Sequence, residues 1–238
     1  MSDTPAPDVV APESARILST LNWLRAGVLG ANDGIVSTAA ILFGVAGASA
    51  SHATVMLAGI AAVAAGALSM GAGEYVSVST QRELEVAELK REKAILARDP
   101  ERELGALTQL FVKRGVEPKI AAQVARQMSD KDALSVHARA ELGIDPDNVT
   151  NPWSAAAASM VSFTIGGAVP MGAMLLSPRA IEIWIAGAAV VVAMVLTGVA
   201  SARLGRIPVL PSIVRNVAGG LLAMGVTYGV GNLAGGQL

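Results

Sequence analysis

The stretch GALSMGAGEYVSVSTQRELEVAELKREKAILAR, Gly66 to Arg98, decides the fold. Its beginning is rich in Gly and Ala, as in membrane helices, and its second half is strongly charged. Neither Gly nor Pro occurs after Gly73 until Pro100, so no helix breaker separates the two halves. At about 1.5 Å per residue, a helix from Thr54 to Ala97 would be roughly 65 Å long, about twice the hydrocarbon thickness. We predict one helix that leaves the membrane unbroken.

The composition is that of a helical membrane protein. The 238 residues have a mean hydropathy of +0.52, and only 16% of them are charged. The net charge of -1 argues against a nucleic-acid partner. Since the chain has no cysteine, a metal ion would have to bind to oxygen, nitrogen or thioether sulfur.

Charged residues concentrate in one polar insert between two apolar blocks. Most of the 18 Lys and Arg and of the 19 Asp and Glu fall between Gln81 and Thr150. We predict an all-α polytopic membrane protein with five transmembrane helices and a helical cytoplasmic insert between the second and third. The expected domains are a disordered tail (1–16), transmembrane helices 1 and 2 (17–80), the insert (81–150) and transmembrane helices 3 to 5 (151–238).

The basic residues predict the orientation of the five spans. The insert and Arg16, Arg25, Arg203, Arg206 and Arg215 fall on one side, whereas the other side has only Arg179 close to a span. By the positive-inside rule the N-terminus and the insert are cytoplasmic, and the C-terminus is outside. High Ala and Gly content suggests a bacterial inner (plasma) membrane.

Within the membrane segments, Asp33, Met70 and Glu74 are the candidates for a transport path. A carboxylate inside a membrane is costly and is usually placed for function. Met70 and Glu74 are four residues apart and share a helix face, where a thioether and a carboxylate suit a borderline divalent ion. The alternative is that Met70 only fills the core and that Glu74 reaches interfacial water.

The insert offers a second set of ligands. Glu85, Glu88 and Glu92 share one face of the long helix; a last helix, for which Ser129 is the expected N-cap, carries His137 and Glu141; Glu101 and Glu103 follow the Pro100 turn. Such an oxygen and nitrogen set fits Fe²⁺ or Mn²⁺, and Zn²⁺ remains open. The same spacing also suits solvated acidic faces. His52 is expected to be solvated on a short loop.

Four motifs carry a resemblance to a known family: LRAGVLGANDGIVSTAA (24–40), GALSMGAGEYVSVSTQRE (66–83), DALSVHARAELGI (132–144) and VTYGVGNLAG (226–235). They resemble the vacuolar iron transporter family over nearly the whole chain from Leu21 onward. The resemblance implies a five-span homodimer that moves Fe²⁺, and in some members Mn²⁺, out of the cytosol in exchange for protons. It places Asp33 and Met70 on the path near the dimer interface.

The resemblance also implies that the insert is a cytoplasmic metal-binding domain. Glu92, Glu103 and Glu141 match its glutamates, and His137 stands where some members have Met. Many members carry an acidic residue one turn after the positions of Glu92 and Glu103. This chain has Ile95 and Ala106 there, and we expect Glu88 and Glu101 to take over the role of the missing residues.

The leading hypothesis is therefore a transporter that exports Fe²⁺ in exchange for protons and takes part in iron homeostasis. It needs the lipid bilayer but no organic cofactor, and the chain is not expected to be an enzyme. Two alternatives stay open: a membrane metal sensor that does not transport, and a membrane di-iron carboxylate enzyme. A di-iron carboxylate enzyme usually has Glu-x-x-His pairs, but neither His52 nor His137 has Glu three residues before it.

Overall fold

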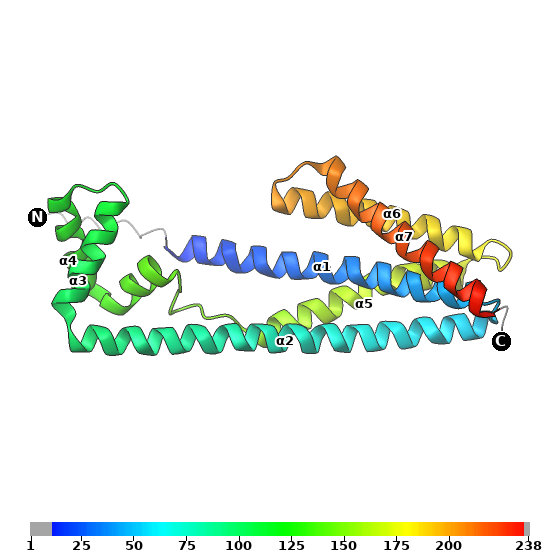
Figure 1. The fold of residues 1–238 in the computed structure, drawn as a ribbon, viewed down its shortest axis with the longest axis horizontal. Coiled ribbons are helices and arrows are strands. Elements are labelled where there is room, and N and C mark those ends of the chain that lie inside the picture. The colour runs from blue at the N-terminus through cyan, green and yellow to red at the C-terminus, as the bar shows by residue number, and fades with distance from the viewer. Residues whose placement is uncertain (1–10, 236–238) are drawn as a thin grey trace, which may run out of the picture. The chain divides into compact units, whose positions relative to one another are not determined.

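The computed structural model describes the backbone of residues 11–235 and the side chains of residues 27–235, and within them the chain is helical without strands (Figure 1). The elements are α1 (Ala11–Gly47), α2 (His52–Arg98), α3 (Pro100–Lys113), α4 (Pro118–His137), the π-helix η1 (Ala138–Leu142), α5 (Pro152–Leu176), α6 (Glu182–Gly205) and α7 (Val209–Gly235). The prediction of one unbroken long helix is confirmed by α2. Of the predicted tail, residues 1–10 lie outside the described residues, and residues 11–16 belong to α1.

The chain divides into two compact units. The insert unit contains residues 77–152 with the first residues of α1, and the membrane unit contains residues 16–76 and 153–235. Five helices of the described chain are long and apolar enough to cross a membrane: Gly27–Gly47 of α1, then α2, α5, α6 and α7. This confirms the predicted number of candidate spans.

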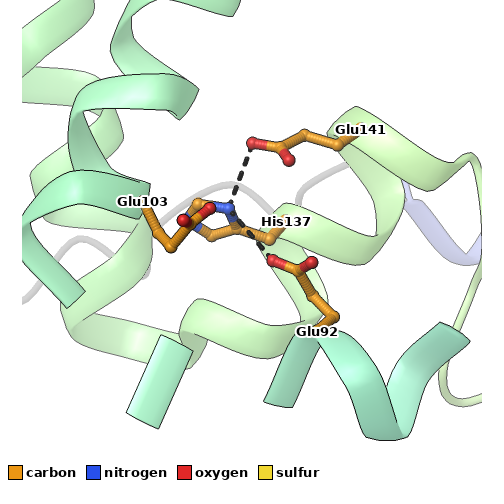
Figure 2. Close-up of side chains that lie close together, drawn as sticks. All are labelled: Glu92, Glu103, His137 and Glu141. Carbon is orange, nitrogen blue, oxygen red and sulfur yellow. Dashed lines mark hydrogen bonds and ion pairs between the residues drawn. The ribbon is translucent and has the colours of Figure 1, made fainter. Parts of the chain in front are cut away.

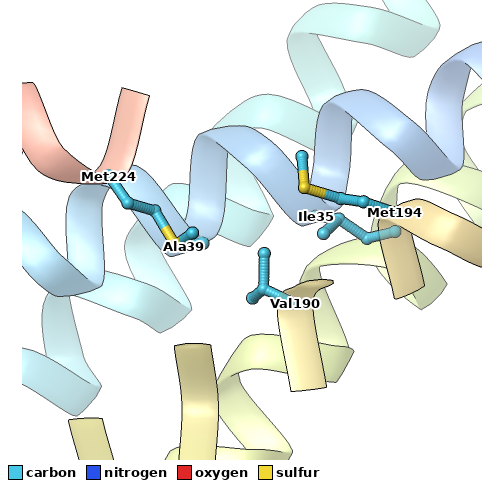
Figure 3. Packing of buried hydrophobic residues seen from close by; sticks show 5 residues of the cluster. All are labelled: Ile35, Ala39, Val190, Met194 and Met224. Atoms are coloured by element: carbon cyan, nitrogen blue, oxygen red, sulfur yellow. The ribbon is translucent and has the colours of Figure 1, made fainter. Parts of the chain in front are cut away.

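The membrane unit is held together by two apolar clusters. In the first, α1, α6 and α7 meet around Ile35, Ala39, Val190, Met194 and Met224 (Figure 3). The second joins α1, α2, α5 and α6 around the buried residues Leu42, Val55, Met174 and Ala186. Side chains from separate helices thus interlock along α1 and α6, the two helices that both clusters share.

Glycines allow α1 and α2 to approach α5 closely. A Cβ on Gly34 would meet the backbone carbonyl of Phe163, and a Cβ on Gly66 would meet the ring of the same residue. Small residues therefore permit close helix contact at both positions.

The start of α2 is tied to the start of α6. His52 Nδ1 lies 2.8 Å from Glu182 Oε2, and the two side chains are only 16% and 15% exposed. The expectation that His52 is solvated was wrong, because the partner carboxylate is 130 residues away in the sequence.

The insert unit is a small helical domain built around α3 and α4. Asp99 Oδ1 accepts a hydrogen bond from Arg102 N–H at 3.3 Å at the start of α3, and Leu107, Ala121 and Ala125 are fully buried. The expectation that Ser129 is the N-cap of a last helix was wrong, because α4 continues through Ser129 and becomes non-helical only at Asp132.

Candidate metal centre

Four side chains of the insert unit converge on one point: Glu92 of α2, Glu103 of α3, His137 at the end of α4 and Glu141 of η1. Each residue offers one ligand atom, and these four atoms all lie within 4.8 Å of one another. Figure 2 shows the imidazole of His137 among the carboxylates, with Nδ1 3.1 Å from Glu141 Oε1 and 3.6 Å from Glu92 Oε1. Three carboxylates and one imidazole form a donor set that suits Fe²⁺, Mn²⁺ or Zn²⁺.

The turns of the insert explain this convergence. Pro100 begins α3 directly after α2 ends, at a position where its missing N–H costs nothing. Asp132 interrupts α4 with φ −161° and ψ 88°, and its Oδ1 accepts a hydrogen bond from Ser135 N–H at 3.1 Å. The following π-helix ends at Gly143, whose φ of 68° is the left-handed conformation that glycine adopts without strain. The kink and the π-turn thereby set the direction of His137 and Glu141.

The electrostatics of the cluster favour a cation. Glu92 is 7% exposed and His137 1% exposed. Burial raises the pKa of the Glu92 carboxyl, the neighbouring Glu141 carboxylate raises it further, and His137 counteracts both. Glu92 Oε1 is buried and accepts no hydrogen bond within the described structure. A bound divalent ion would neutralise the repulsion and satisfy this oxygen.

Three of the acidic residues considered from the sequence lie outside this cluster. Glu88 is 3.9 Å from Arg91, and Glu101 is 3.4 Å from Arg126, both at the surface. Glu85 accepts hydrogen bonds from the N–H and the hydroxyl of Thr150. We expected Glu88 and Glu101 to take the place of the acidic residues that are missing at Ile95 and Ala106. The geometry of this cluster does not support that expectation.

A second candidate site lies in the membrane unit. Asp33 and Met70 line a cavity of about 450 Å³ formed by α1, α2 and α5. Asp33 is exposed, whereas Met70 is partly buried. Glu74, one turn beyond Met70, does not line this cavity.

Further side chains of this cavity were not recognised from the sequence. Ser37 lies one turn after Asp33 and donates a hydrogen bond to its carbonyl oxygen, so helical spacing could have identified it. Phe163 comes from α5 and carries no local signal of such a position.

These features define an integral membrane protein with a carboxylate and histidine cluster in a polar insert and a carboxylate and thioether cavity among its apolar helices. The comparison with known proteins specifies it further. The model of the VIT family matches residues 24–232, and the chain belongs to this family.

Three relatives illustrate the similarity. "Vacuolar iron transporter" of Acanthamoeba castellanii is 42% identical over 221 residues, covering 91% of this chain and 80% of the relative. "Vacuolar iron transporter homolog 2.1" of Arabidopsis thaliana is 30% identical and covers 94% of this chain and 86% of the relative. "Vacuolar iron transporter homolog 1" of Oryza sativa subsp. japonica is 36% identical, with 90% and 74% covered. These eukaryotic relatives are named for a vacuole and do not support a bacterial inner membrane.

Proposed function

We propose that this protein is a proton-coupled transporter that exports Fe²⁺, together with Mn²⁺ or related divalent transition-metal ions, from the cytosol. The observation that carries the proposal is the buried Oε1 of Glu92, which accepts no hydrogen bond within the described structure, in a cluster of four potential ligands and in a chain of the VIT family. The named iron transporters among the relatives support iron as the cargo. Because these relatives are transporters, the chain is not an enzyme.

In this proposal the two sites have separate tasks. Glu92, Glu103, His137 and Glu141 capture the ion, and His137 Nδ1 must lose its proton to become a ligand. Asp33 and Met70 receive the ion in the membrane cavity. The Asp33 carboxylate alternates between a protonated and a metal-bound form, because a nearby cation favours the ionised state. Glu74 completes the path.

The proposed orientation follows from the basic residues. The insert and the N-terminus face the cytosol and the C-terminus faces away from it, in accord with the positive-inside rule. The working form is a homodimer with the path near the interface between its subunits, as the family resemblance implies.

A flux assay tests the proposal. Full-length protein in liposomes with a proton gradient should transport Fe²⁺, and Asp33→Ala should abolish the flux without weakening ion binding by the cluster. Glu88→Ala is the matched control. Because Glu88 lies outside the cluster, this variant should leave the Fe²⁺ flux and ion binding by the cluster unchanged. Unchanged flux in Asp33→Ala would refute the role of this carboxylate. Binding without flux in the wild-type protein would instead identify a metal sensor.

A further inference from the structure

A second, larger cavity of the membrane unit is independent of both metal sites. Its volume is about 550 Å³, and helices α1, α6 and α7 line it with mainly apolar side chains. The hollow arises where α6 and α7 carry small residues: Gly187 and Ala188 on α6 and Gly225 on α7. A Cβ on Gly225 would meet nothing within 4 Å. We call this cavity the α6–α7 groove.

The floor of the groove is formed by the buried core. Met224 lines it and is 4% exposed, and it belongs to the cluster in which α7 packs against Ile35 of α1 and Val190 of α6 (Figure 3). Phe43 packs against the same cluster and contributes a ring to the groove. Buried residues of the core therefore form part of the wall of the groove.

One guanidinium lies at the end of the groove. Arg179 belongs to the connection between α5 and α6, where two candidate spans end and begin, and so lies at the level of lipid headgroups. Among the described residues it has no ion-pair partner, since the nearby Glu182 is engaged by His52 at 2.8 Å. Trp184 and Tyr228, which are 79% and 40% exposed, also line the groove and supply the aromatic rings typical of a membrane interface.

The charge pattern indicates which occupant fits. A second copy packed by two-fold symmetry through this same face would offer Arg179 no carboxylate, because the groove is lined by none. A phospholipid satisfies both parts at once: acyl chains fill the apolar hollow, and the phosphate accepts hydrogen bonds from the guanidinium. We propose that the α6–α7 groove binds an anionic phospholipid, with its headgroup on Arg179 and its acyl chains between α6 and α7.

Tryptophan fluorescence tests this site directly. The chain has three tryptophans, so Trp23→Phe with Trp153→Phe leaves Trp184 as the single reporter in the groove. In vesicles, brominated phosphatidylglycerol should quench Trp184 with about a fivefold preference over brominated phosphatidylcholine, as expected for one basic side chain at the membrane surface. Arg179→Gln should reduce the preference to near one, and Arg179→Lys should keep most of it.

Two further variants separate the groove from the general membrane surface. Gly225→Leu should fill the hollow and also remove the preference, although Arg179 is unchanged. Arg215 is an exposed arginine of α7 that does not line the groove, so Arg215→Gln should retain the preference for phosphatidylglycerol. An unchanged preference in Arg179→Gln would overturn the proposal. A disulfide between two copies of Ala188→Cys would also overturn the proposal. Because the chain has no other cysteine, such a disulfide would show that a second copy covers the groove.

Discussion

Glu92→Gln should change the stability of the protein in opposite directions without and with metal. At the 4.8 Å limit between ligand atoms, two full charges repel by about 3.5 kcal/mol at an effective dielectric constant of about 20. Since the Glu141 side chain is 26% exposed, screening reduces this to about 1 kcal/mol. Removal of the buried charge should therefore stabilise the metal-free protein by about 1 kcal/mol, or about 2–4 °C in Tm.

Metal should reverse the order of the two proteins. At about 100 times the Kd, an ion stabilises the wild-type protein by about 2.7 kcal/mol. A loss of about 10- to 100-fold in affinity would remove roughly 1.3 to 2.3 kcal/mol of this gain in Glu92→Gln, by the same relation. The variant should thus melt above the wild type without metal and below it with metal.

The pH dependence has a defined sign. Because the pKa of Glu92 is raised in the folded protein, its ionisation destabilises the metal-free fold. Wild-type stability should fall as the pH rises from the ordinary value of 4.5 through the raised pKa, and Glu92→Gln should flatten this part of the profile.

Circular dichroism melting of the full chain in detergent, with and without Mn²⁺ and over a range of pH, measures all three effects. Glu88→Gln is the control and should follow the wild type, because Glu88 lies at the surface near Arg91. The reasoning is refuted if Glu92→Gln melts lower than the wild type under both conditions, or if Mn²⁺ raises both melting temperatures equally.

Two other predictions follow from the fold. Asp132→Ala removes the hydrogen bond to Ser135 N–H and should destabilise the last part of α4 by about 1 kcal/mol, seen as faster amide exchange there. That hydrogen bond lowers the pKa of Asp132, so its stabilising effect should be complete above pH 3.8 and lost as the pH falls through the lowered value. Gly34→Ala should cost about 1–3 kcal/mol in thermal melting, because its Cβ meets the Phe163 carbonyl, whereas Gly73→Ala, with nothing within 4 Å, should be neutral or stabilising.

The course of α2 could be predicted because it depends on local chemistry. No Gly or Pro interrupts the chain between Gly73 and Pro100, and α2 is continuous from His52 to Arg98. The starts of α3 and α4 can likewise be read from Pro100 and Pro118, because proline is favoured in the first turn of a helix. The break in α4 was misplaced because Ser129 and Asp132 are both good N-cap residues, and the sequence does not show which one the packing uses.

The cluster of four potential ligands could be predicted only in part from the spacing of its residues. His137 and Glu141 are four residues apart and were paired correctly on one side of a helix. Glu88 and Glu92 are also four residues apart, but only Glu92 meets the other ligands. Which turn of a helix faces its neighbours depends on tertiary packing, and spacing does not contain this information.

The chemistry of the cluster agrees better with transient capture than with permanent storage. In the metal-free protein His137 Nδ1 lies 3.1 Å from Glu141 Oε1, so a proton there competes directly with the ion for the same nitrogen and the same carboxylate. Carboxylate and imidazole ligands also hold divalent iron or manganese less tightly than a thiolate set would hold zinc, and the chain has no thiolates. We therefore expect binding to release protons and to weaken as the pH falls, which favours release of the ion to the next site. Calorimetry in buffers of different ionisation enthalpy would detect these protons, and metal binding without proton release would contradict the argument.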